Sequence, residues 1–387
     1  MKIQFIPLRI IQLSMVLLLG SLVLITGCSE GEDPDDPSFS CTDADGILCD
    51  VAGIAGEQGG SGNGGDALEA FLYWPMDMTH DEEGRLLIVD FNNHCVRRVD
   101  KDNVIERVIG SGLLGDRPFG VADEINLNHP TSITVGPAGD LWLAAWHNWK
   151  LEKITVATWS ATLIAGNSLG FSGDGGPAGL AQLGLPSSVV FDADGNIYIS
   201  DQGNQRIRKI DTDMIITTFA GGDEGFADGV GDNARFSLPA GSNATPGGMI
   251  ALSNDGTFLL LADTKNNRIR KIDIATAEVT TIAGTTGGYS GDGGPAVDAQ
   301  LFYPTDVAFG PDDAIYIADS KNNVIRKIDT NGIITTVVGT REAGFSPNGT
   351  PAKQAKLNQP HGVYVTPDNT LYIADTHNNQ VKKVKNP

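Results

Sequence analysis

Basic residues are in short supply in this sequence. Its 387 residues include 27 lysines and arginines against 48 aspartates and glutamates, a formal net charge of −21. A chain this acidic repels the phosphate backbone, so we exclude general nucleic-acid binding. Helical periodicity is missing too: after the first 27 residues no useful stretch carries apolar residues at helical spacing. That absence excludes the helical fold classes and favours strands and turns.

A targeting segment occupies residues 1–27. A basic start precedes an apolar run over residues 10–25, and Leu-Ile-Thr-Gly-Cys at 24–28 resembles the lipobox that lipoprotein signal peptidase cleaves. The apolar run is short for a membrane span, although an uncleaved anchor helix is the alternative. We predict a lipoprotein signal peptide with Cys28 as the lipidated first mature residue.

The predicted anchor places the protein in the cell envelope. A diacylglycerol and an N-acyl chain on one cysteine exceed the single-chain case, so attachment is stable. Ser29 rather than aspartate follows Cys28, which by the sorting behaviour of such lipoproteins indicates the outer membrane of a Gram-negative bacterium. Membrane contact is expected through the lipid alone.

A lipidated acidic spacer is expected over residues 28–45. Its stretch EGEDPDDPSFS has carboxylates and prolines with one aromatic residue and cannot bury a core. Cys41 and Cys49 lie eight positions apart in an oxidising context, which favours a local disulfide. Cys95 is then a lone thiol or a competing partner for one of them.

A repeat of 56 residues organises the rest of the chain. The segment IYIADSKNNVIRKID at 315–329 has five further, more or less divergent copies. Its aspartate position falls at residues 90, 145, 201, 263, 319 and 375, with Ala145 replacing aspartate in the second copy. The one longer step, of 62 residues, coincides with an insertion at 240–248. Six repeats account for residues 51–386, which leaves no second domain.

Each repeat contains four short strands in this interpretation. A proline opens the first strand, the apolar IYIA run forms the second, an Asn-rich turn leads to the third, and a β-branched run forms the fourth. Radial repetition buries such strands, so we predict an all-β, six-bladed β-propeller of four-stranded antiparallel blades. A stacked solenoid is the rival architecture.

The two ends of the chain favour a closed ring. The last repeat stops after its third strand, while DVAGIAG at 50–56 matches the fourth-strand sequence VTTIAG at 279–284. We therefore predict that the N-terminal strand closes the last blade and that the propeller spans 46–387.

A known repeat family shares these features. The D-x-x-N-N-x-I-R-K-I signature, together with Gly-Asp-Gly-Gly-Pro-Ala at 173–178 and 291–296, resembles NHL repeats. The resemblance covers nearly the whole mature chain and implies the propeller fold. It implies little about activity, because one fold hosts many functions.

Both motifs are interpreted as structural. Each repeat aspartate precedes a turn, where its carboxylate can accept backbone N–H groups as an Asx turn and pair with Arg or Lys on strand three. The Gly-Asp-Gly-Gly loops do not meet the requirements of a phosphate or calcium loop. We interpret them as crossovers between blades, in which Leu183 or Leu301 plugs the gap.

The starts of the first strands are expected to surround one mouth of the central channel. The candidate ligand-binding residues there are Asp77, Thr131, Ser187, Asp306 and His361. Two carboxylates and an imidazole could coordinate a cation or orient a small ligand.

Two tryptophans distinguish the second blade. Trp146 and Trp149 stand where other blades carry Thr and Asn on an exposed turn. Tryptophan supplies a large contact area and a donor, so both are candidate contact residues. The alternative is that the indoles fill space beside Ala145.

Catalytic motifs are sparse. The peptidyl-α-hydroxyglycine α-amidating lyases are NHL-like propellers with Pro-His in three blades, whose histidines hold zinc; only Pro360-His361 matches here. The metal set of gluconolactonase-like propellers has no counterpart that we can map. The histidines at 80, 94, 129, 147 and 377 are interpreted as scattered surface residues.

These observations predict a monomeric exported lipoprotein whose funnel face binds a protein, peptide or glycan. No catalytic residue, metal or cofactor is assigned. The alternative is a metal-dependent lyase or lactonase at the channel mouth, which would use zinc or calcium. A structural cell-surface module is a third hypothesis.

Overall fold

Six antiparallel sheets surround a central axis in the computed structural model, which describes Cys41 and residues 44–241 and 245–387. Residues Ser40–Pro387 form one compact unit. The predicted signal peptide, Cys28 and most of the predicted spacer lie outside the described residues. The prediction of an all-β, six-bladed propeller is confirmed.

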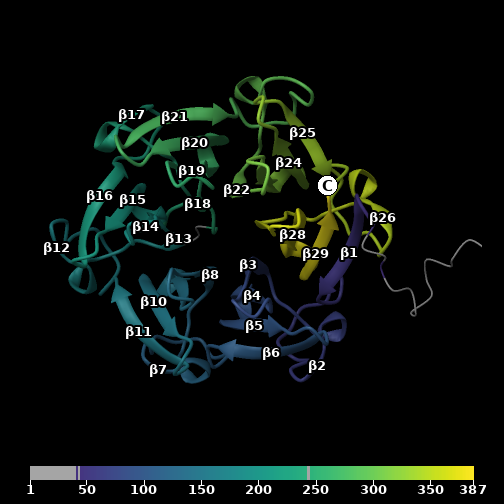
Figure 1. The fold of residues 1–387 in the computed structure, drawn as a ribbon, viewed down its shortest axis with the longest axis horizontal. Helices are drawn as coiled ribbons and strands as arrows, with labels where there is room; N and C mark the ends of the chain where they lie inside the picture. Colours follow the sequence, from purple (N-terminus) through teal and green to yellow (C-terminus); the bar gives the residue numbers. More distant parts are fainter. Residues whose placement is uncertain (1–40, 42–43, 242–244) are drawn as a thin grey trace, which may run out of the picture. The chain divides into compact units, whose positions relative to one another are not determined.

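Each blade has four main strands, numbered here from the channel outward. Blade 1 has β3 (Pro75–His80), β4 (Leu86–Asp90), β5 (Cys95–Val99) and β6 (Val104–Ile109); blade 2 has β8 (Pro130–Val135), β9 (Leu141–Ala145), β10 (Lys150–Thr155) and β11 (Ser160–Ala165); blade 3 has β13 (Pro186–Phe191), β14 (Ile197–Asp201), β15 (Arg206–Ile210) and β16 (Ile215–Gly221). Blade 4 has β18 (Ile250–Leu252), β19 (Phe258–Asp263), β20 (Arg268–Asp273) and β21 (Glu278–Ala283); blade 5 has β22 (Pro304–Phe309), β23 (Ile315–Asp319), β24 (Val324–Ile328) and β25 (Ile334–Val338); blade 6 has β27 (Gly362–Val365), β28 (Thr370–Asp375), β29 (Gln380–Lys385) and β1 (Ile47–Ala52). Figure 1 shows the blades arranged radially, with the first strands nearest the centre.

The crossovers between blades add structure that the sequence did not predict. Five of them pair a two-residue strand with the outer strand of the blade that follows: β2 (Gly65–Asp66), β7 (Gly120–Val121), β12 (Gly176–Pro177), β17 (Gly229–Val230) and β26 (Thr350–Pro351). A short 3-10 helix then follows in each crossover: η1 (Ala67–Glu69), η3 (Ala122–Glu124), η5 (Ala178–Leu180), η7 (Gly231–Asn233), η9 (Ala296–Asp298) and η11 (Ala352–Gln354). A second set forms the turns between strands two and three: η2 (Phe91–Asn93), η4 (Trp146–Asn148), η6 (Gln202–Asn204), η8 (Thr264–Asn266), η10 (Ser320–Asn322) and η12 (Thr376–Asn378).

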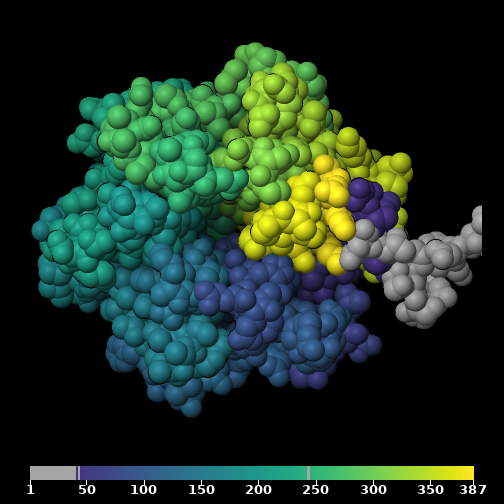
Figure 2. All heavy atoms as spheres, viewed as in Figure 1, coloured from purple at the N-terminus to yellow at the C-terminus, as the bar shows by residue number. Residues whose placement is uncertain are grey.

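The N-terminal strand closes the ring, as predicted. β1 pairs antiparallel with β29, with Asp50 opposite Lys382, and purple β1 lies beside yellow blade 6 in Figures 1 and 2. The predicted alignment was displaced by three residues. Gly53, at φ +92°, lies against the Asn379 carbonyl, just as Gly284 lies against the Asn267 carbonyl in blade 4. The strand therefore ends at Ala52-Gly53 rather than at Ala55-Gly56.

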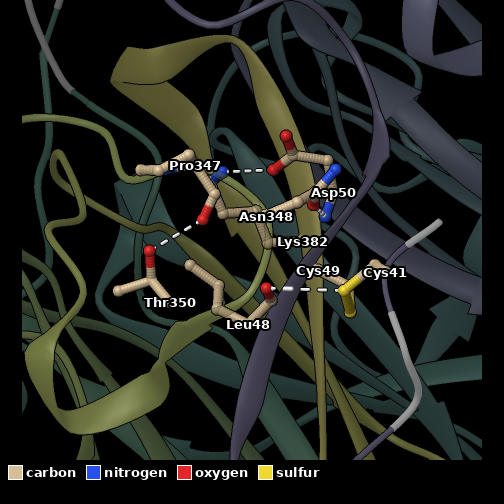
Figure 3. Close-up of a disulfide and its surroundings, with 8 residues drawn as sticks. All are labelled: Cys41, Leu48, Cys49, Asp50, Pro347, Asn348, Thr350 and Lys382. Carbon is tan, nitrogen blue, oxygen red and sulfur yellow. Dashed lines mark hydrogen bonds and ion pairs between the residues drawn. A yellow bond between two sulfur atoms is a disulfide. The ribbon is translucent and has the colours of Figure 1, made fainter. Parts of the chain in front are cut away.

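A disulfide joins Cys41 to Cys49 on β1. Figure 3 shows it on one side of the strand, beside the neighbouring ion pair between Asp50 and Lys382. Cys95 is buried and has a free thiol. The bridge ties the chain that precedes the propeller directly to its closing strand.

Apolar contacts between neighbouring blades form the core. Leu87 and Val89 of β4, for example, share a cluster with Leu143 of β9, which explains why the second strands are apolar on both faces. One leucine at the end of each crossover is completely buried, and the set comprises Leu72, Leu127, Leu183, Leu238, Leu301 and Leu357. The gap-filling role expected for two of these leucines therefore extends to all six crossovers.

The repeat aspartates are structural, but they do not form Asx turns. In blade 4 the Asp263 carboxylate accepts from the Ser237 backbone N–H, 2.8 Å away in the crossover, and pairs with Arg270 at 2.7 Å. Arg270 in turn reaches Asp228 of the crossover at 2.7 Å. This network fastens the crossover to blade 4, and the equivalent Asp–Arg–Asp network does so in blades 3 and 5, because a buried carboxylate needs several partners.

The two asparagines of the repeat have separate structural roles. In blade 5, Asn322 donates to Asp319 at 2.8 Å, within its own blade. Asn323 accepts from the backbone N–H of Gln359, 2.9 Å away at the start of blade 6. The second asparagine therefore connects one blade to the next in three places, where Asn267, Asn323 and Asn379 bind the N–H of the residue just before a blade-opening proline.

Candidate functional site

The two predicted channel aspartates link neighbouring inner strands. Asp77 Oδ2 accepts from the Ile133 N–H of blade 2 at 2.9 Å, and Asp306 Oδ2 accepts from the Val363 N–H of blade 6 at 2.8 Å. Burial raises the pKa of Asp77 to about 6. Burial and then the charge of Asp77 raise the pKa of Asp306 well above its usual range. Both carboxylates therefore hold neighbouring inner strands together by accepting backbone N–H groups from the next blade.

Thr131 and Ser187 are also committed to the fold, contrary to the predicted ligand-binding role. Both are completely buried. Thr131 Oγ1 donates to the Pro186 carbonyl at 3.4 Å, and Ser187 Oγ donates to the Gly248 carbonyl at 3.4 Å. Tight packing of the inner strands turns these hydroxyls toward the next blade, which removes them from the candidate site.

The prediction that Trp146 is exposed is wrong. Its side chain is 1% exposed and packs against Phe91 of blade 1, with ring centroids 5.9 Å apart. Trp149 is half-buried and packs against the same apolar cluster. The indoles fill space beside Ala145, which was the alternative interpretation of this blade.

The histidines are not scattered. Five of the six join a run of ring contacts that spans blades 2, 1 and 6. His129 Nδ1 lies 3.0 Å from His147 Nδ1. At the other end, His377 stacks on Trp74 with centroids 4.8 Å apart and lies 6.3 Å from His361. Burial, followed by the nearby His94 and His147, lowers the pKa of His129 to about 4, so this imidazole is neutral at pH 7.

A pocket of about 340 Å³ opens at the His361 end of this run. Its walls come from turns, crossover ends and first strands of several blades: Trp74, Met76, Pro239, Ala240, Thr245, Pro246, Lys265, Tyr303, Ser320, Lys321, Gln359, His361 and His377. Of the predicted ligand-binding residues, only His361 lines it. Its described lining contains lysines, histidines, amide and hydroxyl groups, and no carboxylate.

Ser320 carries a buried hydroxyl that has no hydrogen-bond partner within the described part of the chain. The corresponding turn residues of blades 4 and 6 are satisfied: Thr264 Oγ1 accepts from the Gly248 N–H at 2.9 Å, and Thr376 Oγ1 donates to the Pro75 carbonyl at 2.7 Å. Ser320 is 1% exposed. A hydroxyl left in this state costs about 1–3 kcal/mol.

His361 presents a second polar atom of this kind. Its side chain is 6% exposed, and Nδ1 has no hydrogen-bond partner among the described residues. Burial, then the nearby His377 and Lys321, lowers the pKa of His361 to about 3. The imidazole is neutral at pH 7, so one ring nitrogen donates and the other accepts.

Sequence reasoning missed most of the pocket. Trp74, Tyr303 and Gln359 each directly precede a blade-opening proline and have positive φ angles of 58°, 59° and 45°. Ser320 and Lys321 begin the blade 5 turn. A comparison of turn positions between blades could have identified Ser320, since blades 1 and 2 carry large aromatic residues there.

No group of three or more His, Cys, Asp or Glu side chains that could hold a metal ion occurs within residues 41, 44–241 and 245–387. In that same portion of the chain, no helix is sufficiently long and apolar to cross a membrane.

Family models match two segments of the chain. Residues 283–347 match the teneurin NHL domain, and residues 357–384 match the NHL repeat. The chain is 29% identical over 329 residues to SUPPRESSOR OF QUENCHING 1 of Arabidopsis thaliana, covering 81% of this chain and 30% of that protein. It is 25% identical to NHL repeat-containing protein 2 of Homo sapiens, covering 80% of this chain and 46% of that protein. These segments thus match NHL sequences, and the chain spans less than half of either relative.

Solved structures show the same fold at low sequence identity. An auxiliary nutrient binding protein from Bacteroides thetaiotaomicron superimposes with a TM-score of 0.63 at 15% identity, over 87% of this chain and 75% of that chain. This similarity concerns the propeller as a whole.

Proposed function

We propose that this NHL-repeat propeller is an exported binding protein that holds a small ligand, or the end of a glycan or peptide, in the pocket at its channel mouth. The supporting observation is that Ser320 and His361 line the pocket with buried polar atoms that have no partner in the described chain. A ligand that bonds these atoms recovers a cost of about 1–3 kcal/mol at each. We assign no chemical transformation to the site.

The size of the pocket favours a small ligand. Its 340 Å³ lies near the lower end of the roughly 300–1,000 Å³ typical of small-molecule sites. The walls combine the aromatic rings of Trp74 and Tyr303 with side chains that both donate and accept hydrogen bonds. The fold of the auxiliary nutrient binding protein is consistent with such a role.

A phenylalanine at position 320 tests the location of the site. Blades 1 and 2 carry Phe91 and Trp146 at this turn position, so Ser320→Phe suits the backbone while filling the pocket. On arrays of saccharides and short peptides, we expect the full-length chain to bind at least one class of these compounds. Ser320→Phe should weaken that binding at least tenfold, because a loss of about 1.4 kcal/mol of binding free energy corresponds to a tenfold weaker affinity.

Thr212→Phe is the matched control, because Thr212 is exposed in the turn after β15, at the opposite end of the third strand. This variant should bind like the wild type, and both variants should keep the wild-type melting temperature within a few degrees. Equal binding by Ser320→Phe and the wild type would place the ligand elsewhere.

We further propose that a lipid on Cys28 anchors the propeller in the cell envelope, in the outer membrane of a Gram-negative host, and that it acts as a monomer without nucleic-acid partners. The basic start, the apolar run and the sequence at 24–28 support the anchor.

Cys28→Ser should move most of the protein from the membrane to the soluble fraction, because the signal then lacks its lipid attachment point. Membrane retention of this variant would contradict the lipid anchor.

A further inference from the structure

We infer that the mouth pocket recognises an acidic sugar of the hexuronate class, an inference that rests on the proposed function. The charge of the lining is the first argument. The whole chain has 48 acidic against 27 basic residues, yet the described lining contains Lys265, Lys321, His361 and His377 and no carboxylate. His361 is neutral at pH 7, so the two lysines supply the positive charge of the lining, and this charge favours an anion through local electrostatics.

Lys321 is the side chain positioned to pair with a ligand carboxylate. Its Nζ lies 3.9 Å from the centroid of the Tyr303 ring, a cation–π contact that holds the ammonium at the pocket wall. Ion pairs within the described chain do not include Lys321, whereas Lys265 pairs with Glu224. Lys321 therefore offers an unneutralised charge, and it also contributes to the lowered pKa of His361.

The uncharged part of the pocket matches a hydroxylated ring. Trp74 and Tyr303 supply aromatic surface, and Trp74 is held in place by the stacked His377 ring, 14° from parallel. Ser320 Oγ and His361 Nδ1 are the atoms in need of partners. A sugar offers hydroxyls that both donate and accept, while a simple aromatic acid would leave these buried atoms unsatisfied.

The inference is tested by calorimetric titration of the full-length chain in detergent micelles with two pairs of sugars. Each pair, glucuronate with glucose and galacturonate with galactose, differs only in the carboxylate. We expect one uronate to bind about tenfold more tightly than its neutral partner, because a charge-assisted hydrogen bond is roughly twice as strong as a neutral one. The preference should shrink as NaCl is raised, since the lysine is exposed.

Lys321→Met should remove the preference, weakening uronate binding about tenfold and leaving the neutral sugar unchanged. The control is Lys101→Met, at an exposed lysine in the turn after β5, which should behave as the wild type.

Equal binding of acid and neutral sugar, or an equal loss of both in Lys321→Met, would overturn the acidic assignment and leave the proposed function standing. Absence of all sugar binding by a wild type that binds another class on the arrays would overturn the sugar assignment alone. If no saccharide or peptide bound the wild type in a way that Ser320→Phe weakens, the proposed function itself would be wrong.

Discussion

A chain that begins at Gly53 is expected to lose its cooperative unfolding transition. Without β1, the apolar side chains of Leu48 and Ala52 leave the core, where they are 1% and 0% exposed. Lys382, which is completely buried, loses its partner Asp50. Leaving a buried charge without its partner costs about 3–5 kcal/mol, out of the roughly 5–15 kcal/mol that keep a domain folded.

The measurement is urea unfolding followed by tryptophan fluorescence and circular dichroism. A chain that begins at Ser40 retains β1 together with the Cys41–Cys49 bridge and should unfold in one cooperative step. A Gly53 chain that unfolds at the same urea concentration would show that the ring does not need the N-terminal strand.

Glu152→Gln should change how stability depends on pH. Glu152 of β10 occupies the position that holds Arg208 in blade 3 and Arg270 in blade 4. It is 0% exposed, and neither carboxylate oxygen has a hydrogen-bond partner in the described chain. Burial raises the pKa of Glu152 to about 8, although Lys150 opposes the shift.

The pH range follows from the sign of this shift. The folded-state pKa lies above the usual value of 4.5, so the folded chain holds this proton while the unfolded chain releases it. The stability present below pH 4.5 is lost at about 1.4 kcal/mol per pH unit until pH 8. We expect Glu152→Gln to remove that slope, because glutamine does not titrate.

Urea unfolding of the wild type and the Gln variant at pH 5 and pH 8 gives the comparison. Between pH 5 and pH 8 the free energy of unfolding of the wild type should fall by roughly 3–4 kcal/mol relative to that of the variant, as the slope above implies. The histidines with lowered pKa values act in the opposite direction in both proteins, so the difference isolates position 152. Parallel pH profiles would show that Glu152 is already ionised in the folded state.

The architecture could be predicted because it rests on local patterns that recur six times. The proline, the apolar second strand and the asparagine turn specify strand order in every blade. The register of β1 was harder, since Ala52-Gly53 and Ala55-Gly56 both match the end of a fourth strand. The register is fixed by the pairing of β1 with β29 from the other end of the chain, in which Asp50 lies opposite Lys382. The sequence pattern alone does not contain that contact.

The binding residues were harder to predict for a physical reason. Thr131 and Ser187 were identified by their place at the channel, but the six inner strands pack so closely that these hydroxyls bond to the next blade. His361 lines the pocket from the position directly before β27, the first strand of blade 6. The histidine run depends on contacts between different blades, such as His129 with His147, which only the closed ring brings together.

The position of a bound ligand tests the central claim most directly, namely that the mouth pocket is the binding site. A crystal structure of the chain grown with galacturonate should show the sugar between Trp74 and Tyr303, with oxygens within hydrogen-bonding distance of Ser320 Oγ and the His361 ring and its carboxylate beside Lys321. Density for the sugar at another surface, with only water against Ser320 and His361, would contradict the account.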